Sequence, residues 1–238
     1  MKRISRHHLA NKVTLFVIGL FIMAIGVALS IKANLGVSPI SCVPYVLSLH
    51  VELTIGELTI IFNSFIVLLQ ILLLRRRYRL LQLLQIVAAS FFGYFIDCSM
   101  VLLHSVRPES YWLQLFTCVA SCAVLAFGVF LIVKANLTYL PGEGLAVTIA
   151  DLLQTEFGKV KIRIDSAMVL CGVVASLLIF GELLGIREGT IIAALLVGYL
   201  VKQFVIRFSF IDRYFPVNDE PAKRTLTATT ANDTAGPQ

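Results

Sequence analysis

The sequence predicts an all-α fold, a polytopic membrane helix bundle of six transmembrane helices plus two short broken or re-entrant helices. Composition gives two reasons for this. Hydrophobic residues make up 58% of the 238 residues and charged residues 14%, whereas a soluble domain carries about 25% charged residues. Several apolar runs exceed the roughly 17 residues that cross a hydrocarbon layer about 30 Å thick. The lipid bilayer is therefore the expected surrounding of most of the chain.

An internal duplication is the third observation. Residues 26–39 read GVALSIKANLGVSP and residues 128–141 read GVFLIVKANLTYLP, so at an offset of 102 residues seven of the first ten positions are identical. Further along, Gly56 matches Gly158 at the same offset. Because polar residues keep this register inside an apolar chain, we interpret the chain as two copies of one membrane unit, and we expect two inverted-topology repeats.

The predicted elements follow the apolar runs and their breaks. The chain divides into a basic segment at 1–12, repeat 1 at 13–103, a loop at 104–110, repeat 2 at 111–207 and a tail at 208–238. Spans are expected at 13–31, 58–74, 80–103, 115–133, 162–180 and 190–206, and short helices at 35–49 and 137–153. Within the tail, residues 216–238 are rich in Pro, Thr, Ala and Asn, a composition typical of disorder.

The first apolar run, 13–31, follows four basic residues, an order that resembles a signal peptide. Its copy at 115–133 lies deep inside the chain, where no signal peptide can lie. We therefore interpret 13–31 as an uncleaved first transmembrane helix.

The positive charges predict the orientation. With the N-terminus in the cytoplasm, six crossings place the arginine-rich run 75–79 and the C-terminus inside, and the loops 104–110 and 181–189 outside. If the two short segments also crossed, eight crossings would turn run 75–79 outward. Three crossings per copy invert the second copy relative to the first. Inverted repeats with broken segments at matching positions are typical of secondary transporters, whose broken segments form the substrate site.

Three stretches resemble the YczE/YyaS/YitT group of bacterial multi-pass membrane proteins, and YczE-like members above all. They are GVALSIKANLGVSPISCVPYVLS at 26–48, the start of the second span from Gly56 to Asn63, and IREGT at 186–190. The resemblance covers about residues 13–207. It implies a multi-pass protein of the bacterial cell (inner) membrane, and it implies no particular activity.

The two breaks hold the first candidate site residues. Asn34 and Asn136 follow matching lysines, and Ser38 with Pro39, like Pro141 in the second copy, is typical of a helix start. A helix N-terminus there favours an anionic ligand, to which the lysines add charge. The structural alternative is that the lysines extend to the membrane interface and the asparagines cap a turn.

Four acidic or amide residues are further candidates. Glu143 lies in the first turn of the second short helix, where it either couples transport to an ion or caps the helix. Asn63 and Asp165 occupy equivalent positions, facing the bundle interior or, for Asp165, pairing with a nearby basic residue. Asp97 is a candidate proton or cation site.

A pair of matching glycines and one short stretch are further features of the sequence. Gly93 and Gly198 match at an offset of 105, and both are expected to permit close helix packing. The stretch 185–190 either forms a gate or is a solvated turn.

These residues favour a small-molecule secondary transporter of unknown substrate. The alternative is a membrane accessory or regulatory protein that acts through a partner complex. We expect no enzyme, because no Ser/His/Asp set and no H-E-x-x-H occur. The five cysteines form no C-x-x-C pair and no nucleotide-binding motif is present, so we expect no metal and no cofactor. The positive charges lie at the ends of apolar runs, which argues against a nucleic-acid partner.

Overall fold

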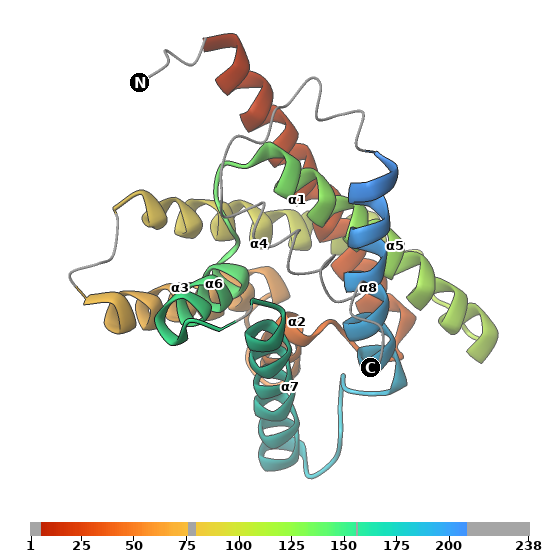
Figure 1. Cartoon of the computed structure of the whole chain (residues 1–238). Helices are drawn as coiled ribbons and strands as arrows, with labels where there is room; N and C mark the ends of the chain where they lie inside the picture. The colour runs from red at the N-terminus through yellow and green to blue at the C-terminus, as the bar shows by residue number, and fades with distance from the viewer. Residues whose placement is uncertain (1–5, 76–79, 156, 209–238) are drawn as a thin grey trace, which may run out of the picture.

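The computed structural model describes residues 6–75, 80–155 and 157–208, and these residues are helical apart from their connections (Figure 1). The helices are α1 (Arg6–Ala33), α2 (Pro39–Ser48), α3 (Ile55–Leu74), the 3₁₀ helix η2 (Leu80–Leu83), α4 (Leu84–Leu102), α5 (Tyr111–Ala135), α6 (Pro141–Leu153), α7 (Phe157–Phe180) and α8 (Glu188–Arg207). Six of them, α1, α3, α4, α5, α7 and α8, are long and apolar enough to cross a membrane.

Local sequence explains where several helices begin. Thr54 caps α3: its hydroxyl accepts from the backbone N–H of Glu57, and the Glu57 carboxylate accepts from the N–H of Thr54. This reciprocal pair is a capping box, which satisfies two backbone donors that the helix itself leaves open. Pro39 and Pro141 each occupy the first residue of a short helix, where a missing N–H costs nothing.

The core of the molecule is the crossing of α1 and α5, the repeat-related long helices. A β-carbon at Gly26 would lie 2.6 Å from the backbone N of Leu125, and one at Gly128 would lie 2.5 Å from the backbone N of Met23. The partner number falls as the residue number rises, so the two helices run antiparallel. The contacts are also reciprocal, because Gly128 is the copy of Gly26 and Leu125 is the copy of Met23.

The antiparallel crossing bears on the number of membrane crossings. Between α1 and α5 the chain passes through α2, α3 and α4. If α3 and α4 each cross once, α5 runs opposite to α1 only when α2 does not cross. A fully spanning α2 would make α1 and α5 parallel. The observed direction therefore supports six crossings rather than eight.

Most helix pairings occur in both halves. Helix α1 packs against α4 as α5 packs against α8, and α2 packs against α7 as α6 packs against α3. The pairs α2–α3 and α6–α7 also correspond. One pairing is not duplicated: α3 and α4 pack along each other, whereas α7 and α8 make at most a marginal contact in the described residues. Figure 1 shows α3 and α4 side by side and α7 and α8 apart, joined by a loop.

The structure confirms the all-α class, six apolar helices and two shorter ones. The helices are longer than the predicted spans: α7 begins at Phe157, so Lys159 and Lys161 belong to the helix rather than to the loop before it. A helix continues past the apolar run because its backbone hydrogen bonds stay satisfied at the polar edge. The tail from 209 and the arginines at 76–79 lie outside the described residues.

The glycine prediction is confirmed in one copy only. A β-carbon at Gly93 would lie 2.5 Å from the carbonyl oxygen of Gly56, so α3 and α4 pack closely there. The prediction is wrong at Gly198, because nothing lies within 4 Å of the position that a β-carbon would take there. The reason is that α8 packs against α5 and leaves α7.

Candidate functional site

The two asparagines of the repeated segment end the two core helices. Asn34 has φ 56° and Asn136 has φ 47°, both in the left-handed region. Asn136 is the C-cap of α5, and its N–H donates to the carbonyl of Ile132. Asparagine tolerates this backbone conformation better than most residues. At both breaks the asparagine therefore ends a helix, as the structural alternative, in which the asparagines cap a turn, predicts.

The break after α1 is covered by the end of the α7–α8 loop and by the first residues of α8. The N–H of Gly189 donates to the carbonyl of Leu35 at 2.7 Å, and the N–H of Val37 donates to the carbonyl of Gly185 at 3.1 Å. Gly36 lies between these bonds with φ 117°, and a β-carbon there would lie 2.5 Å from Oγ1 of Thr190. Only glycine fits both the backbone conformation and the space. The stretch 185–190 is therefore packed against the first break rather than a free turn.

Two buried serine hydroxyls lie at the N-terminus of α2. Ser38 is the N-cap residue, as predicted, but its hydroxyl pairs with the hydroxyl of Ser41 at 3.0 Å instead of capping a backbone N–H. Both serines are buried. Pro39 beside them is half-buried and begins the helix.

The N-termini of the two short helices meet in the interior. A β-carbon at Gly142, the second residue of α6, would lie 2.4 Å from Cδ1 of Ile40, the second residue of α2. These residues are repeat equivalents at the offset of 102. Pro141 is buried beside them. The end of the Ile40 side chain occupies the space beside Gly142, so a larger residue at this position would displace that side chain.

Two glutamines bind the start of α6. The side-chain amide of Gln70 on α3 donates to the carbonyl of Pro141 at 2.9 Å and to Oε1 of Gln85 on α4 at 3.2 Å. A β-carbon at Gly144 would lie 2.7 Å from the same Gln85 oxygen. Both glutamines are buried. Sequence reasoning missed them, although a glutamine within an apolar span is itself a signal of an interior contact.

Asn63 faces the interior of the bundle and its equivalent faces the edge. Asn63 is 2% exposed, and its amide donates to the carbonyl of Thr59 at 2.9 Å. Asp165 is partly exposed and pairs with Lys161 at 2.5 Å, four residues earlier on α7. This is the ion pair that the sequence left open as the alternative. Glu143 on α6 is partly buried and lies close enough to Lys161 and Asp165 to interact electrostatically with both.

Asp97 caps α3. One carboxylate oxygen accepts from the hydroxyl of Thr54 at 2.7 Å and the other from the N–H of Gly56 at 2.8 Å. The carboxylate thus satisfies a backbone donor of the first turn of α3 and fixes α4 against it. This geometry gives Asp97 a structural role and separates it from the residues around α6.

The structure thus brings one group of predicted residues together and leaves another apart. The group around the short-helix N-termini is formed by Ser38, Pro39, Pro141 and Glu143, with Gln70, Gln85 and Lys161 added. Asn34 and Asn136 lie at the ends of α1 and α5, which are opposite ends of an antiparallel pair. Within the described residues no three His, Cys, Asp or Glu side chains gather as a metal site would require.

Comparison with known proteins identifies the family. No curated protein and no solved structure is detectably similar to this chain. The sequence profile of a family described as a family of unknown function, DUF6198, matches residues 10–205. That match includes both short helices and all of the long ones except the first residues of α1 and the last two of α8. The chain therefore belongs to the DUF6198 family of unknown function.

Proposed function

We propose that this membrane protein is a secondary transporter of a small polar solute, with its binding site where the short helices α2 and α6 meet. The observation that carries the proposal is the interior contact of Ile40 with Gly142, residues at matching positions of the two copies. Broken segments that meet in this way form the substrate site of inverted-repeat transporters. The YczE-like resemblance stays a prediction and adds no substrate.

The reciprocal contacts support an inverted duplication, which stays a prediction. Gly26 meets Leu125 as Gly128 meets Met23, and this exchange of partners is what a two-fold axis between α1 and α5 produces. The corresponding pairs α1–α4 and α5–α8 support the same symmetry. An inverted pair can exchange its two conformations, and that exchange exposes the central site first at one end and then at the other.

Each break has its own cover, which supports alternating access. The stretch 185–190, which includes the first residues of α8, binds residues 35–37 after the end of α1. Gln70 and Gln85 bind the start of α6, which follows the end of α5. Since α1 and α5 are antiparallel, the two covers lie towards opposite ends of the core. We infer that one cover opens while the other stays closed.

The first experiment identifies the solute. Cells with and without the protein are compared by untargeted measurement of accumulated solutes, and the enriched solute is then tested for uptake by purified protein in liposomes. Movement of that solute down an imposed gradient supports the proposal. If no solute differs and liposomes stay inactive with a correctly folded protein, the transporter assignment is wrong.

The second experiment locks one cover. Asn34 and Arg187 are exposed, and the Arg187 guanidinium donates to the Asn34 carbonyl at 3.4 Å. In a background without the native cysteines, Asn34→Cys with Arg187→Cys is joined by a short reducible crosslinker. Uptake should stop and return after reduction, while each single variant stays active. Full uptake in the locked protein contradicts the gating assignment.

One observation favours the accessory or regulatory alternative. Helices α7 and α8 present large exposed apolar side chains, among them Leu170, Leu178, Ile191 and Leu195, and pack little against each other. Lipid covers such side chains, but the open glycine positions of these helices, Gly158 and Gly198, would also admit a helix of a partner protein. Purification in a mild detergent with a stoichiometric second protein, and no stabilisation by any solute, would favour this function over transport.

A further inference from the structure

Helices α7 and α8 are held together at the end where their loop joins them and are open at the other end. At the loop end the Ser176 hydroxyl donates to the carbonyl of Glu182 at 2.7 Å and accepts from the N–H of Leu184 at 2.8 Å. At the other end Gly158 of α7 and Gly198 of α8 each have nothing within 4 Å of the position that a β-carbon would take. Figure 1 shows the two helices apart.

The pair α3–α4 shows the same residue types in contact. A β-carbon at Gly93 would lie 2.5 Å from the carbonyl oxygen of Gly56 and 2.5 Å from Cγ1 of Ile60, so the isoleucine covers the glycine. At the offsets of 102 and 105 the residues that match this isoleucine and this glycine are Ile162 and Gly198. Ile162 is 69% exposed, whereas Ile60 is half-buried. The second half thus carries the residues of the contact without the contact itself.

Helix α2 keeps α7 within reach of α8. It contacts both of them, as α6 contacts both α3 and α4. A β-carbon at Gly172 of α7 would lie 2.9 Å from Cβ of Cys42 on α2, so the two helices cross closely there. Fourteen residues, or about 21 Å of helix, separate this crossing from Gly158. Of the residues of α7 before the crossing, all of which the structure describes, Val160 and Met168 are the buried ones. The crossing can therefore act as a pivot for the first half of α7.

The carboxylate that holds α3 to α4 has no equivalent on α8. Asp97 on α4 accepts from the N–H of Gly56, in the first turn of α3. At the offset of 105 the matching residue is Lys202, and an ammonium group can only donate. The N–H of Gly158 lies in the first turn of α7, where the helix itself offers no acceptor. A contact of α7 with α8 would therefore have the glycine packing of the first pair without its carboxylate, which makes the contact weaker and reversible.

A turn of α7 about this pivot would also change the charges around the start of α6. Lys161 and Asp165 form an ion pair at 2.5 Å and lie within seven residues of Gly158, in the half of α7 that would turn. Both interact electrostatically with Glu143 in the first turn of α6. The position of α7 thus affects the group of residues where the two short helices meet.

We propose that α7 is the moving helix of this protein, and that its first half closes on α8 in a second conformation. In the closed conformation Ile162 covers Gly198 as Ile60 covers Gly93. The proposal rests on the proposed function, since it names the element that moves during transport. The pair α3–α4, which already has this contact, is the reference for the closed arrangement.

The test measures the distance between spin labels on the two helices, in purified protein without the other cysteines and in lipid nanodiscs. Arg163→Cys on α7 and Gln203→Cys on α8, both at exposed positions, carry the labels. The matched reference is Ile61→Cys on α3 with the native Cys98 on α4, which are exposed and occupy the corresponding positions. The α7–α8 pair should give two distances, and the shorter one should agree with the reference. A single long distance overturns the proposal.

Two variants should shift the populations in opposite directions. Lys202→Asp places a carboxylate where the first pair has one and should raise the ratio of closed to open protein by about tenfold. Gly198→Leu fills the space that closure needs and should abolish the short distance. Tyr199→Leu is the control and should leave both distances unchanged, because Tyr199 is 58% exposed and its counterpart Tyr94 stays 64% exposed in the closed pair. A short distance that persists in Gly198→Leu contradicts the proposal, and this variant decides alone if Lys202→Asp does not fold.

Further outcomes separate this proposal from its rivals. Dilution with unlabelled protein should leave the short distance in place, and its loss would mean that α7 meets α8 of a second copy, which overturns closure within one chain. Closure without uptake of any solute in liposomes removes the transporter and keeps the moving helix. Uptake that Gly198→Leu leaves unchanged keeps the transporter and removes the role of α7 in it.

Discussion

The α3–α4 pair and the α7–α8 pair occupy corresponding places in the two copies, and they pack differently. In the first pair Gly56 meets Gly93 and the Asp97 carboxylate caps α3. In the second pair the equivalent glycines, Gly158 and Gly198, are exposed with nothing within 4 Å. The glycines match in the two halves, but the contacts that close the helix pair occur in the first half only. The first copy is thus a fixed unit, and the second is held mainly through α2 and α5.

The largest expected loss of stability comes from a large side chain placed between α3 and α4, where Gly56 and Gly93 meet. Gly93→Leu places a side chain against the backbone of Gly56 and should cost about 3 kcal/mol of unfolding free energy. Gly198→Leu should change it by less than about 0.5 kcal/mol, because its surroundings are open. Reversible unfolding in mixed micelles measures both. Equal losses would mean that α7 and α8 pack against each other as closely as α3 and α4 do, which would break the comparison.

Removal of the Asp97 carboxylate should cause the next largest loss of stability. Asp97→Ala deletes two hydrogen bonds and leaves the N–H of Gly56 without its acceptor, at a cost of about 2 kcal/mol. Asp151→Ala, at an exposed position on α6, is the control and should be neutral within about 0.5 kcal/mol. The same unfolding measurement applies. If uptake is lost while stability is unchanged, Asp97 acts in transport, as the sequence first suggested.

The capping threonine should contribute less. Thr54→Ala removes the cap of α3 and should cost about 1 kcal/mol. Because Thr54 also donates to Asp97, the double variant should lose less than the sum of the two single losses. A double-mutant cycle measures this coupling. Strict additivity would show that the cap and the carboxylate stabilise α3 independently.

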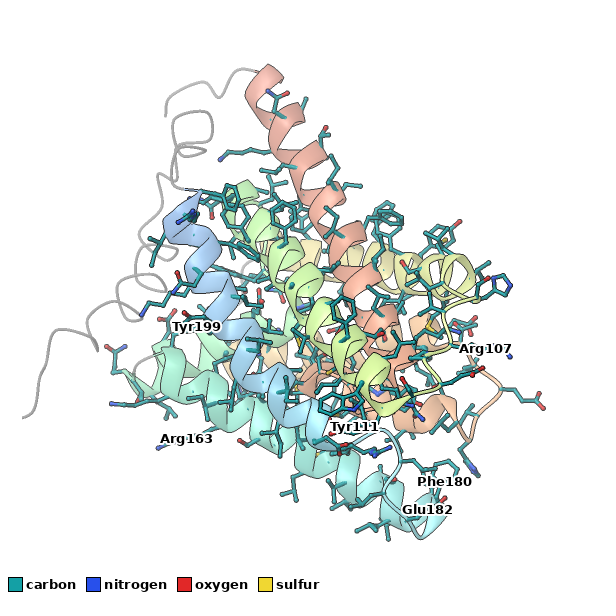
Figure 2. The ribbon with its side chains drawn as sticks, turned by 90° about the vertical axis from the view of Figure 1, so that its right-hand side faces the viewer. Arg107, Tyr111, Arg163, Phe180, Glu182 and Tyr199 are labelled. Atoms are coloured by element: carbon teal, nitrogen blue, oxygen red, sulfur yellow. The ribbon has the colours of Figure 1, made fainter. Side chains whose placement is uncertain are left out.

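The smallest perturbation tests the orientation of the copies. Single cysteines at Ser105 and Glu182, both exposed, should leave stability unchanged and react with a membrane-impermeant reagent from the same side. Figure 2 shows Arg107 and Glu182 towards one side of the view and Arg163 and Tyr199 towards the other. A cysteine at Arg163 should therefore be labelled only from the opposite side. Labelling of Ser105 and Glu182 from different sides would contradict six crossings and the inverted arrangement together.

Much of the fold could be predicted because the membrane restricts the choices. Apolar length set the number of spans, and the proline starts of the short helices were visible as Pro39 and Pro141. The site was less accessible to sequence reasoning. Gln70 gives no sign in the chain that it binds Pro141, 71 residues later. Asp97 likewise gave no sign that it caps a helix that begins 42 residues earlier, because a cap contributed by another helix leaves no local pattern.

The sequence by itself indicated the lipid bilayer, the helices and the repeated segment, since these follow from local apolar length, from proline and asparagine at the breaks, and from the register of matching residues. Only the tertiary structure decided which copy packs tightly and which carboxylate is a cap. The physical reason is that hydrogen-bond satisfaction and close packing depend on what a neighbouring helix presents. Corresponding segments of the two halves therefore acquire different roles once their neighbours differ.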